Sequence, residues 1–344
     1  MTLRVSLRDT RRTLARPAEN ARQRWAERDA CIITLESNDG ARGQGECAPL
    51  PGFSPDSLEH ARRALAHFDP SGVPLDLEPG ASALVELARV GLRIPAELPA
   101  ARCALEAAVL DLWATRAEQP AWALLRGVAA GPPHSRDVSA LLQGDLRGVL
   151  AQAELASAHG INTFKLKIGR PGLLEAELEL VRELRCALGA SACLRLDANR
   201  SLSVEQARAW LPRFVEHGLE LVEEPCPRSA WPELSALGVP LALDESLLEL
   251  DPASALHELD GVRAVILKPS VLGGVSGCTA WARWAEARGA QVVLSHAFEG
   301  SLGLALSATL ALCFGSEQLA HGLDRESRLR PWPEPGFGLT EPLG

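Results

Sequence analysis

Five short apolar segments of this chain each end in charged residues of the types that bind metal ions or move protons. In chain order these charged residues are Lys165 and Lys167, then Asp197, Glu223, Asp244 and Lys268. From Lys167 onward they recur every 21 to 30 residues. This interval is roughly the length of one strand and one helix in an eightfold barrel of about 250 residues. The pattern therefore predicts one charged group in each successive strand-and-helix unit.

The place of these charges in their segments predicts where they lie. An apolar strand buried on both faces belongs to a parallel sheet covered by helices, and it tolerates a charge only at its carboxyl end, where the loops begin. Barrel enzymes carry out their chemistry at that end. Three acids collected there would repel one another unless a cation or a proton intervened. Because their ligand atoms are all oxygens, we expect Mg²⁺, with Mn²⁺ as a substitute, and lysines that transfer protons beside it.

The elements around these residues fall into two regions. In residues 1–97 we expect strands at 5–15, 30–37 and 42–46, joined in part by a hairpin turn at 38–40, and a helix from about residue 54 to 68. These form a small α+β domain. From 98 to 324, helical patterns such as 100–116, 173–188 and 204–216 alternate with short strands, which include 138–142, 292–295 and 318–320. This predicts an α/β barrel, with the proline-rich segment 325–344 packing back on the first domain.

Composition narrows the class of protein. The chain has 344 residues, 47% of them hydrophobic, and a formal net charge of −9. An acidic chain without a basic stripe is not expected to bind nucleic acid, and the absence of an 18-residue apolar run argues against a membrane span. The eight cysteines include no Cys-x-x-Cys pair, as expected for small buried residues in a reducing compartment. We therefore expect a cytoplasmic protein that acts on a small molecule.

Two of the acidic positions are ambiguous. Glu223 is followed by Glu224, and Asp244 by Glu245. Successive strand residues point to opposite faces, so only one member of each pair faces the barrel axis. Both faces of these strands are apolar, and spacing alone does not decide which member binds the metal.

The motifs resemble those of a known superfamily. Lys165-x-Lys167, Asp197-x-Asn199, Glu223-Glu224-Pro225, Asp244-Glu245-Ser246 and Lys268-Pro269 are similar to the enolase superfamily, in the branch where a lysine base follows the second barrel strand. The segment Gly45–Ser54 resembles the N-terminal loop of the o-succinylbenzoate synthases. The resemblance runs from about residue 24 to 324.

This resemblance implies a fold and a reaction. The fold is a modified TIM barrel, (β/α)7β, capped by an N-terminal α+β domain that the C-terminal segment completes. Mg²⁺ would be held by Asp197, Glu223 and Asp244. The reaction would be dehydration of 2-succinyl-6-hydroxy-2,4-cyclohexadiene-1-carboxylate to o-succinylbenzoate, through an enediolate, in menaquinone or phylloquinone biosynthesis.

The resemblance also implies roles for the lysines. Lys167 would remove the α-proton, with its pKa lowered by the cation, by Lys165 and by partial burial. Lys165 would also contact the substrate carboxylate. Lys268, on the opposite side, would act as a cation against the ring intermediate. Asn199, Glu224 and Glu245 would contact these lysines and metal ligands and hold them in place, without binding the metal themselves.

Residues for the rest of the substrate are less clearly marked. Ser295 and Ser301 lie in the segment after the seventh expected strand, where the family has serines that contact the succinyl tail, although His296 and Gly300 depart from the commonest family pattern. Arg195 is expected to face the barrel interior below the acids. A substrate contact and an ion pair with one of the acids are equally expected for it.

Three reactions remain open at this point. The first is the dehydratase, a carbon–oxygen lyase. The second is an isomerase of the same superfamily, such as an N-succinylamino acid racemase, a dipeptide epimerase or a cycloisomerase, which also uses lysines from both sides. The third is a Schiff-base aldolase that uses Lys268, in which the three acids would have no role. A non-catalytic binding protein is less consistent with two lysines facing an acidic cluster, and a homo-oligomer is a further expectation.

Overall fold

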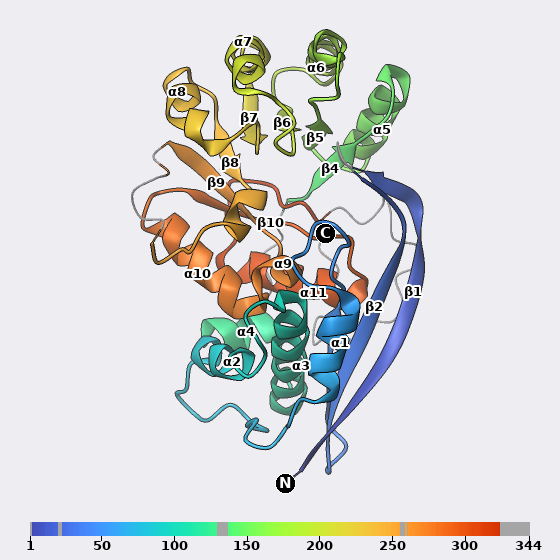
Figure 1. Cartoon of the computed structure of the whole chain (residues 1–344), viewed down its shortest axis with the longest axis vertical. Coiled ribbons are helices and arrows are strands. Elements are labelled where there is room, and N and C mark those ends of the chain that lie inside the picture. Colours follow the sequence, from blue (N-terminus) through green and yellow to red (C-terminus); the bar gives the residue numbers. More distant parts are fainter. Residues whose placement is uncertain (1, 20–22, 129–136, 255–258, 260, 324–344) are drawn as a thin grey trace.

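The chain folds into two sheets with helices around them. The computed structural model describes residues 2–19, 23–128, 137–254, 259 and 261–323. Within these residues there is a three-stranded sheet in the order β1-β2-β3 and a seven-stranded sheet in the order β10-β9-β8-β7-β6-β5-β4. Figure 1 shows the first sheet along one side of the molecule, while the second curls with helices on its outer side. The expected packing of 325–344 lies outside the described residues.

The N-terminal sheet is an antiparallel meander. Its strands are β1 (Leu3–Glu19), β2 (Arg24–Ser37) and β3 (Arg42–Cys47). The predicted hairpin turn between β2 and β3 is confirmed, because Gly40 has a φ of +90° and its N–H donates to the carbonyl of Ser37 at 3.0 Å. The strands are longer than the alternation of residues predicted. The helix that follows is α1 (Leu58–Ala66), within the predicted span.

Helix α3 connects the N-terminal sheet to the barrel. The helices of this part are α2 (Ala83–Gly91), α3 (Pro99–Ala117) and α4 (Ala121–Arg126). The backbone of α3 lies directly on β3, because a Cβ on Gly45 would lie 1.9 Å from the carbonyl oxygen of Ala104. Only glycine permits this approach. On other sides α3 packs against α9 (Pro269–Leu272) and α10 (Gly274–Glu286) of the barrel, so it is buried between the two parts.

The parallel sheet is the barrel. Its strands are β4 (Ser139–Leu142), β5 (Thr163–Lys167), β6 (Cys193–Asp197), β7 (Leu219–Glu223), β8 (Leu241–Leu243), β9 (Val262–Leu267) and β10 (Gln291–Leu294). Lys167 is in register with Asp197, which is in register with Glu223. The register therefore places the charged ends of neighbouring strands at one level.

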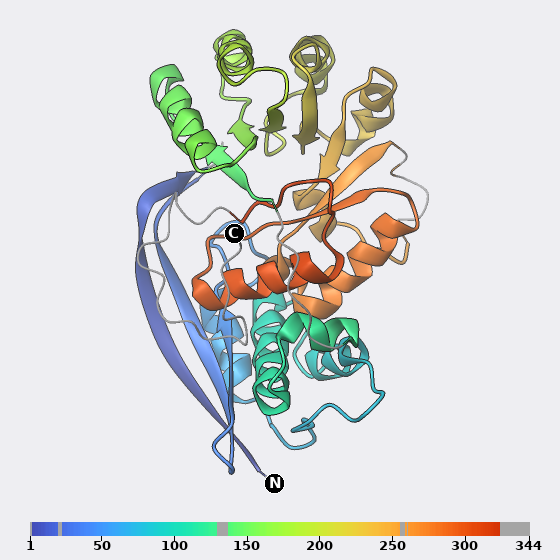
Figure 2. The same cartoon turned by 180° about the vertical axis from the view of Figure 1, so that it is seen from behind.

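The helices that follow the strands lie outside the barrel, as Figure 2 shows from behind. They are α5 (Leu146–Ala158), α6 (Leu174–Leu188), α7 (Val204–Val215), α8 (Trp231–Ala236), α9 (Pro269–Leu272), α10 (Gly274–Glu286) and α11 (Ser301–Phe314), with 3-10 turns η1 (Arg228–Ala230) and η2 (Glu245–Leu248). The sequence-predicted helices 100–116, 173–188 and 204–216 agree with α3, α6 and α7 to within a residue at each end.

The eighth barrel position is occupied by a short segment. Val138 forms a parallel bridge with His321, and Ser295 forms one with Gly322. These bridges join the β4 side of the sheet to the β10 side and close the barrel. The strand predicted at 318–320 is wrong, because the pairing falls on His321 and Gly322 and consists of single bridges. No described helix is both long and apolar enough to cross a membrane, and five of the eight free cysteines (31, 47, 103, 226 and 278) are buried.

Candidate active site

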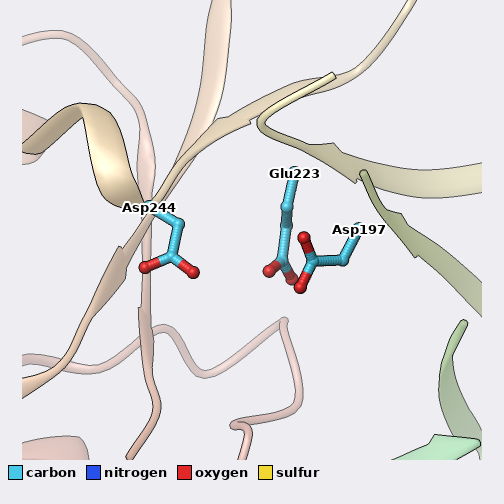
Figure 3. A group of neighbouring side chains, drawn as sticks. All are labelled: Asp197, Glu223 and Asp244. Atoms are coloured by element: carbon cyan, nitrogen blue, oxygen red, sulfur yellow. The ribbon is translucent and has the colours of Figure 1, made fainter. Parts of the chain in front are cut away.

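Three acidic side chains meet at the carboxyl ends of consecutive barrel strands. Asp197 and Glu223 are the last residues of β6 and β7, and Asp244 directly follows β8. Each offers a carboxylate oxygen, and these oxygens all lie within 4.8 Å of one another. Figure 3 shows the three carboxyl groups turned toward a shared space, from separate strands. We call them the carboxylate trio.

The carboxylate trio has the donor set of a hard divalent cation. All its ligand atoms are oxygens, and the three side chains are 2%, 1% and 5% exposed in chain order. Three buried carboxylates so close together repel one another unless positive charge lies between or beside them. The residues present therefore fit Mg²⁺ or Mn²⁺.

Two lysines of β5 flank the trio on one side. Lys165 Nζ lies 2.9 Å from Glu223 Oε2 and 3.4 Å from Asp197 Oδ2. Lys167 Nζ donates to Asn199 Oδ1 at 2.6 Å and lies 3.5 Å from Asp197 Oδ2. Both side chains point the same way because they are two residues apart on one strand. Lys165 is thus bound to two trio members, whereas Lys167 lies at the edge of the group.

A third lysine flanks the trio from the opposite side. Lys268, which follows β9, donates through Nζ to Asp244 Oδ2. The same Nζ lies 4.5 Å from the ring centroid of Phe53. Phe53 belongs to the loop after β3, so the N-terminal domain supplies one wall of the site. A cation on an aromatic face is a favourable contact, more so where water is excluded.

The charges of the site perturb one another strongly. Burial lowers the pKa of Lys165, but the carboxylates of Glu223, Asp197 and Asp244 more than reverse this, so its pKa is above that of a free lysine. Burial likewise lowers the pKa of Lys268, but the nearby carboxylates outweigh this effect and raise it above the ordinary value. Asp244 makes the largest contribution among them. The positive charge of these two lysines therefore offsets part of the negative charge of the trio.

The acids respond in opposite directions. Burial raises the pKa of Asp197, yet the neighbouring lysines outweigh it and hold that pKa well below the usual range. Burial raises the pKa of Glu223, and the negative charges of Asp197 and Asp244 raise it further. Lys165 opposes this increase, but the pKa of Glu223 remains above the ordinary value. Groups with displaced pKa values collect at functional sites, and here they share one barrel mouth.

The structure distinguishes the adjacent acids. Glu224, which is fully buried, turns away from the trio: its Oε1 accepts from the N–H groups of Asp244 and Ser246 at 2.8 and 2.7 Å, and its Oε2 accepts from Arg200 Nε at 2.8 Å. It therefore fixes the backbone that carries Asp244. Glu245 accepts from Asn199 Nδ2 at 2.6 Å, and burial with nearby Asp244 raises the pKa of Glu245 to about 8.

Asn199 connects the two sides of this arrangement. Its amide oxygen accepts from Lys167, its amide nitrogen donates to Glu245, and its backbone N–H donates to Asp197 Oδ1 at 3.1 Å. The backbone φ is +43° at Asn199, +58° at Arg200 and +39° at Glu224. Such values are uncommon for residues with side chains and collect at functional sites. The turns after β6 and β7 are thus held in strained conformations that orient these groups.

The remaining predicted residues lie in different surroundings. Arg195 is 1% exposed, and it donates to Glu220 Oε2 at 2.5 Å and to the carbonyl of Ala320 at 2.8 Å. Its ion pair is therefore with Glu220 rather than with a trio member. Ser295 follows β10 and is 8% exposed, and its N–H donates to the carbonyl of Leu267 at 2.8 Å. Ser301 is the first residue of α11.

Phe53 reaches the site although it was not predicted as a site residue. Phe53 lies in the segment that carries the resemblance to the synthase loop, but its contact with Lys268 joins residues more than 200 positions apart. The signal in the sequence was an aromatic residue in a Pro-Gly turn, which by itself does not indicate a partner.

Comparison with known proteins agrees with the fold. Residues 148–335 match the model of the enolase C-terminal domain-like family, and residues 2–126 match that of the mandelate racemase / muconate lactonizing enzyme N-terminal domain. The o-succinylbenzoate synthase of Desulfotalea psychrophila is 31% identical over 321 residues, which cover 85% of this chain and 85% of that protein.

Two further proteins are similar over most of this chain. Protein PHYLLO, chloroplastic, of Arabidopsis thaliana is 28% identical over 330 residues, but these cover 90% of this chain and only 19% of that protein. The dipeptide epimerase of Methylococcus capsulatus, solved with Mg and the dipeptide L-Arg-D-Lys, superposes with a TM-score of 0.79 at 26% identity, covering 96% of this chain and 93% of that one.

Proposed function

This chain belongs to the enolase superfamily, in its mandelate racemase and muconate lactonizing enzyme group, and on that premise we propose that it is an o-succinylbenzoate synthase. The proposed reaction is the syn-dehydration of 2-succinyl-6-hydroxy-2,4-cyclohexadiene-1-carboxylate to o-succinylbenzoate, with Mg²⁺ and through an enediolate. It would serve menaquinone or phylloquinone synthesis.

The carboxylate trio is the proposed metal site. Asp197, Glu223 and Asp244 would hold the cation. When bound there, Mg²⁺ supplies concentrated positive charge beside the substrate carboxylate, which makes the α-proton acidic enough to remove.

The chain's own groups carry the proton. Lys167 takes the α-proton as the C–H bond breaks, and it returns that proton to the departing hydroxyl as the C–O bond breaks, so that water leaves and the ring becomes aromatic. Asn199 holds Lys167 Nζ in place at 2.6 Å. Lys165 offsets part of the negative charge of the substrate carboxylate and of the trio. Lys268 and Phe53 form the opposite wall, against which the ring lies.

One observation carries the proposal: lysines stand on both sides of the carboxylate trio. Lys167 comes from β5, before the first trio strand, and Lys268 follows β9, after the last one. A substrate carboxylate at the trio would therefore have its α-carbon between an amine on one face and a cation on the other. The synthase at 31% identity and the loop that carries Phe53 support dehydration as the reaction.

The same observation supports a second candidate. Two amines on opposite faces of an α-carbon can remove a proton from one face and return one to the other, which is the chemistry of an N-succinylamino acid racemase or a dipeptide epimerase. The similarity to a solved dipeptide epimerase at 26% identity favours this alternative. We place it second because the N-terminal loop resembles that of the synthases.

We also propose roles for the three remaining predicted residues, Ser295, Ser301 and Arg195. Ser295 at the end of β10 and Ser301 at the start of α11 would contact the succinyl tail. For Arg195, bonded to Glu220 and the Ala320 carbonyl, we propose that it supports the strand ends below the substrate.

The test is an assay of both reactions on the purified protein. Conversion of the cyclohexadiene carboxylate to o-succinylbenzoate is followed by ultraviolet absorbance, with Mg²⁺ and with EDTA, and polarimetry follows an N-succinylamino acid in parallel. Dehydration that EDTA abolishes and Mg²⁺ restores is the expected result. Racemisation without dehydration would replace the synthase by the isomerase, and turnover that EDTA leaves unchanged would contradict both.

A further inference from the structure

A buried cluster of charged and polar residues lies between the N-terminal sheet and the barrel loops, apart from the carboxylate trio. Its main members are Arg28 of β2, Glu46 of β3, Ser270 of α9 and Glu299 of the loop before α11, and each is 4% exposed or less. Burying charge is costly unless each group is bonded. The bonds within this interdomain cluster therefore indicate what it holds in place.

Glu299 fixes the turn that carries Lys268. Its Oε1 accepts from the hydroxyl of Ser270, and its Oε2 accepts from the N–H of Ala297 at 2.6 Å. Ser270 is two residues beyond Lys268. The carbonyl of Lys268 accepts from the N–H groups of the next turn, at Val271 and Leu272, at 3.0 Å each. Through this turn the backbone of Lys268 is tied to Ser270, and through Ser270 to Glu299.

Glu46 in turn fixes the loop that carries Glu299. Its Oε1 accepts from the N–H of Gly300 at 2.7 Å and its Oε2 from the N–H of Gly303 at 3.1 Å. These are free donors at the start of α11, where a carboxylate is favoured. A Cβ on Gly303 would lie 2.5 Å from Glu299 Cβ, so glycine lets the two acids pack together. A residue of the N-terminal sheet thus caps a barrel helix.

Arg28 connects the loop that carries Glu299 to the loop that follows β3. Its guanidinium donates to the carbonyls of Ala48 and Pro49 at 2.5 and 3.0 Å and to the carbonyl of Phe298 at 3.3 Å. Ala48 and Pro49 begin the loop that carries Phe53, whose ring faces Lys268 Nζ. The side chain and the backbone of Lys268 are therefore both held by elements that meet in the interdomain cluster.

We propose that Glu299 is a positioning residue for Lys268, acting through the Ser270 hydroxyl and α9, and that Glu46 of the N-terminal domain holds Glu299 in position. This inference rests on the role of Lys268 proposed above. Glu299 makes its bonds to Ser270 and to its own loop, so its effect on turnover would come through placement. Small displacements of a reacting group lower kcat strongly, and 1 Å can cost about 100-fold.

The test compares four variants with the parent enzyme: Ser270→Ala, Glu299→Gln, the double variant, and Ser307→Ala as the control. Ser307 is 1% exposed and its hydroxyl donates to the Gly303 carbonyl of its own helix at 3.1 Å, so it matches Ser270 in burial. Assays use whichever of the two substrates the parent turns over. Each measurement gives kcat, KM and the thermal unfolding midpoint.

We expect kcat to fall about tenfold in Ser270→Ala and in Glu299→Gln while KM and the unfolding midpoint stay near the parent values, since placement rather than binding is lost. The double variant should be no slower than the slower single variant, because both substitutions act on the same Ser270–Glu299 bond: one removes its donor and the other replaces its carboxylate acceptor by a weaker amide oxygen. Ser307→Ala should leave kcat unchanged.

Two results would overturn the inference, and a third would overturn its premise. Single-variant kcat values within twofold of the parent, with Lys268→Ala inactive, would show that the cluster does not position Lys268. The inference would also be overturned if the losses in kcat of the two single variants multiplied in the double variant and followed the decrease in unfolding midpoint. That result would indicate a merely structural role. Full activity in Lys268→Ala would instead remove the role proposed for Lys268 itself. If Glu299→Gln does not fold, Ser270→Ala and its control decide the question.

Discussion

At the scale of single residues, the site divides its lysines by what they contact. Lys165 is bound to two members of the carboxylate trio, and its pKa is raised above the ordinary value, with burial opposed by those acids. Lys167 contacts the neutral amide of Asn199 at 2.6 Å and lies 3.5 Å from Asp197. A general base must first lose its own extra proton, and it can then take one from the substrate. The less tightly paired Lys167 suits that role.

Replacing Lys167 by alanine should therefore abolish turnover and leave cation binding intact. The expected loss in kcat is at least about 1000-fold, in the range of a general base, because the remaining lysines are held by the trio. Steady-state assays give kcat, and titration with Mn²⁺ by electron paramagnetic resonance gives the affinity for the cation. Appreciable residual turnover would contradict the role of Lys167 as the base.

Replacing Asp244 by asparagine should weaken cation binding at least about tenfold, the scale seen when a metal site loses part of its support. The matched control is Glu245→Gln, which changes the neighbouring acid that faces Asn199. The same Mn²⁺ titration measures both. Unchanged affinity in Asp244→Asn together with a large loss in Glu245→Gln would make Glu245 the ligand.

At the scale of elements, acids on one element satisfy the free N–H groups of another. Glu106 of α3 accepts from the N–H of Ser276 at 2.9 Å and from its hydroxyl, at the start of α10. Glu106 is fully buried. Burial raises its pKa to about 7, against the opposing effect of the bonds from Ser276. Helix α10, the second helix after Lys268, is thus capped by a group that titrates near neutrality.

This raised pKa predicts how stability varies with pH. The folded state binds the Glu106 proton more tightly than the unfolded state does, so the stabilisation is complete below the ordinary glutamate pKa and is lost as pH rises through about 7. Relative to Glu106→Gln, the parent should lose on the order of 3 kcal/mol of unfolding free energy between about pH 5 and pH 8. Urea unfolding at both pH values measures this. Equal pH dependence in the two proteins would refute it.

At the scale of the whole molecule, the N-terminal domain is part of the site. Figures 1 and 2 show α3 between the N-terminal sheet and the helices of the barrel. The loop after β3 carries Phe53 to Lys268, and β3 itself carries Glu46 to the start of α11. Both contacts start from β3 or from the loop that follows it, and β3 packs directly on α3.

Replacing Gly45 by alanine tests this contact. The new Cβ would lie 1.9 Å from the carbonyl oxygen of Ala104, and backbone on both sides leaves little room to yield. We expect a loss of about 3 kcal/mol in unfolding free energy together with reduced kcat. Gly148→Ala is the control, because its nearest neighbour is a side-chain oxygen at 3.2 Å and its effect should stay within about 1 kcal/mol. Equal stability of the two variants would argue against a tight β3–α3 contact.

Much of the fold could be predicted from the sequence, because its signals are local. The apolar segments and helical patterns follow from side-chain periodicity, which each stretch carries by itself. The seven barrel strands, the hairpin turn and α3 were predicted in this way. The domain boundary after residue 97 stays a prediction. Helix α3 lies on the barrel side of that boundary in the sequence, but it packs on both β3 and α9.

The sequence by itself determined which acids and lysines recur at strand ends, and hence that they share the barrel mouth, because parallel strands in register bring their carboxyl ends to one level. Only the tertiary structure decided which acid of each adjacent pair joins the carboxylate trio. It turned Glu224 onto backbone N–H groups and Glu245 onto Asn199. Only the tertiary structure also brought Phe53 to Lys268 and Glu299 to Ser270. Those contacts join residues far apart in the chain, and packing rather than spacing sets them.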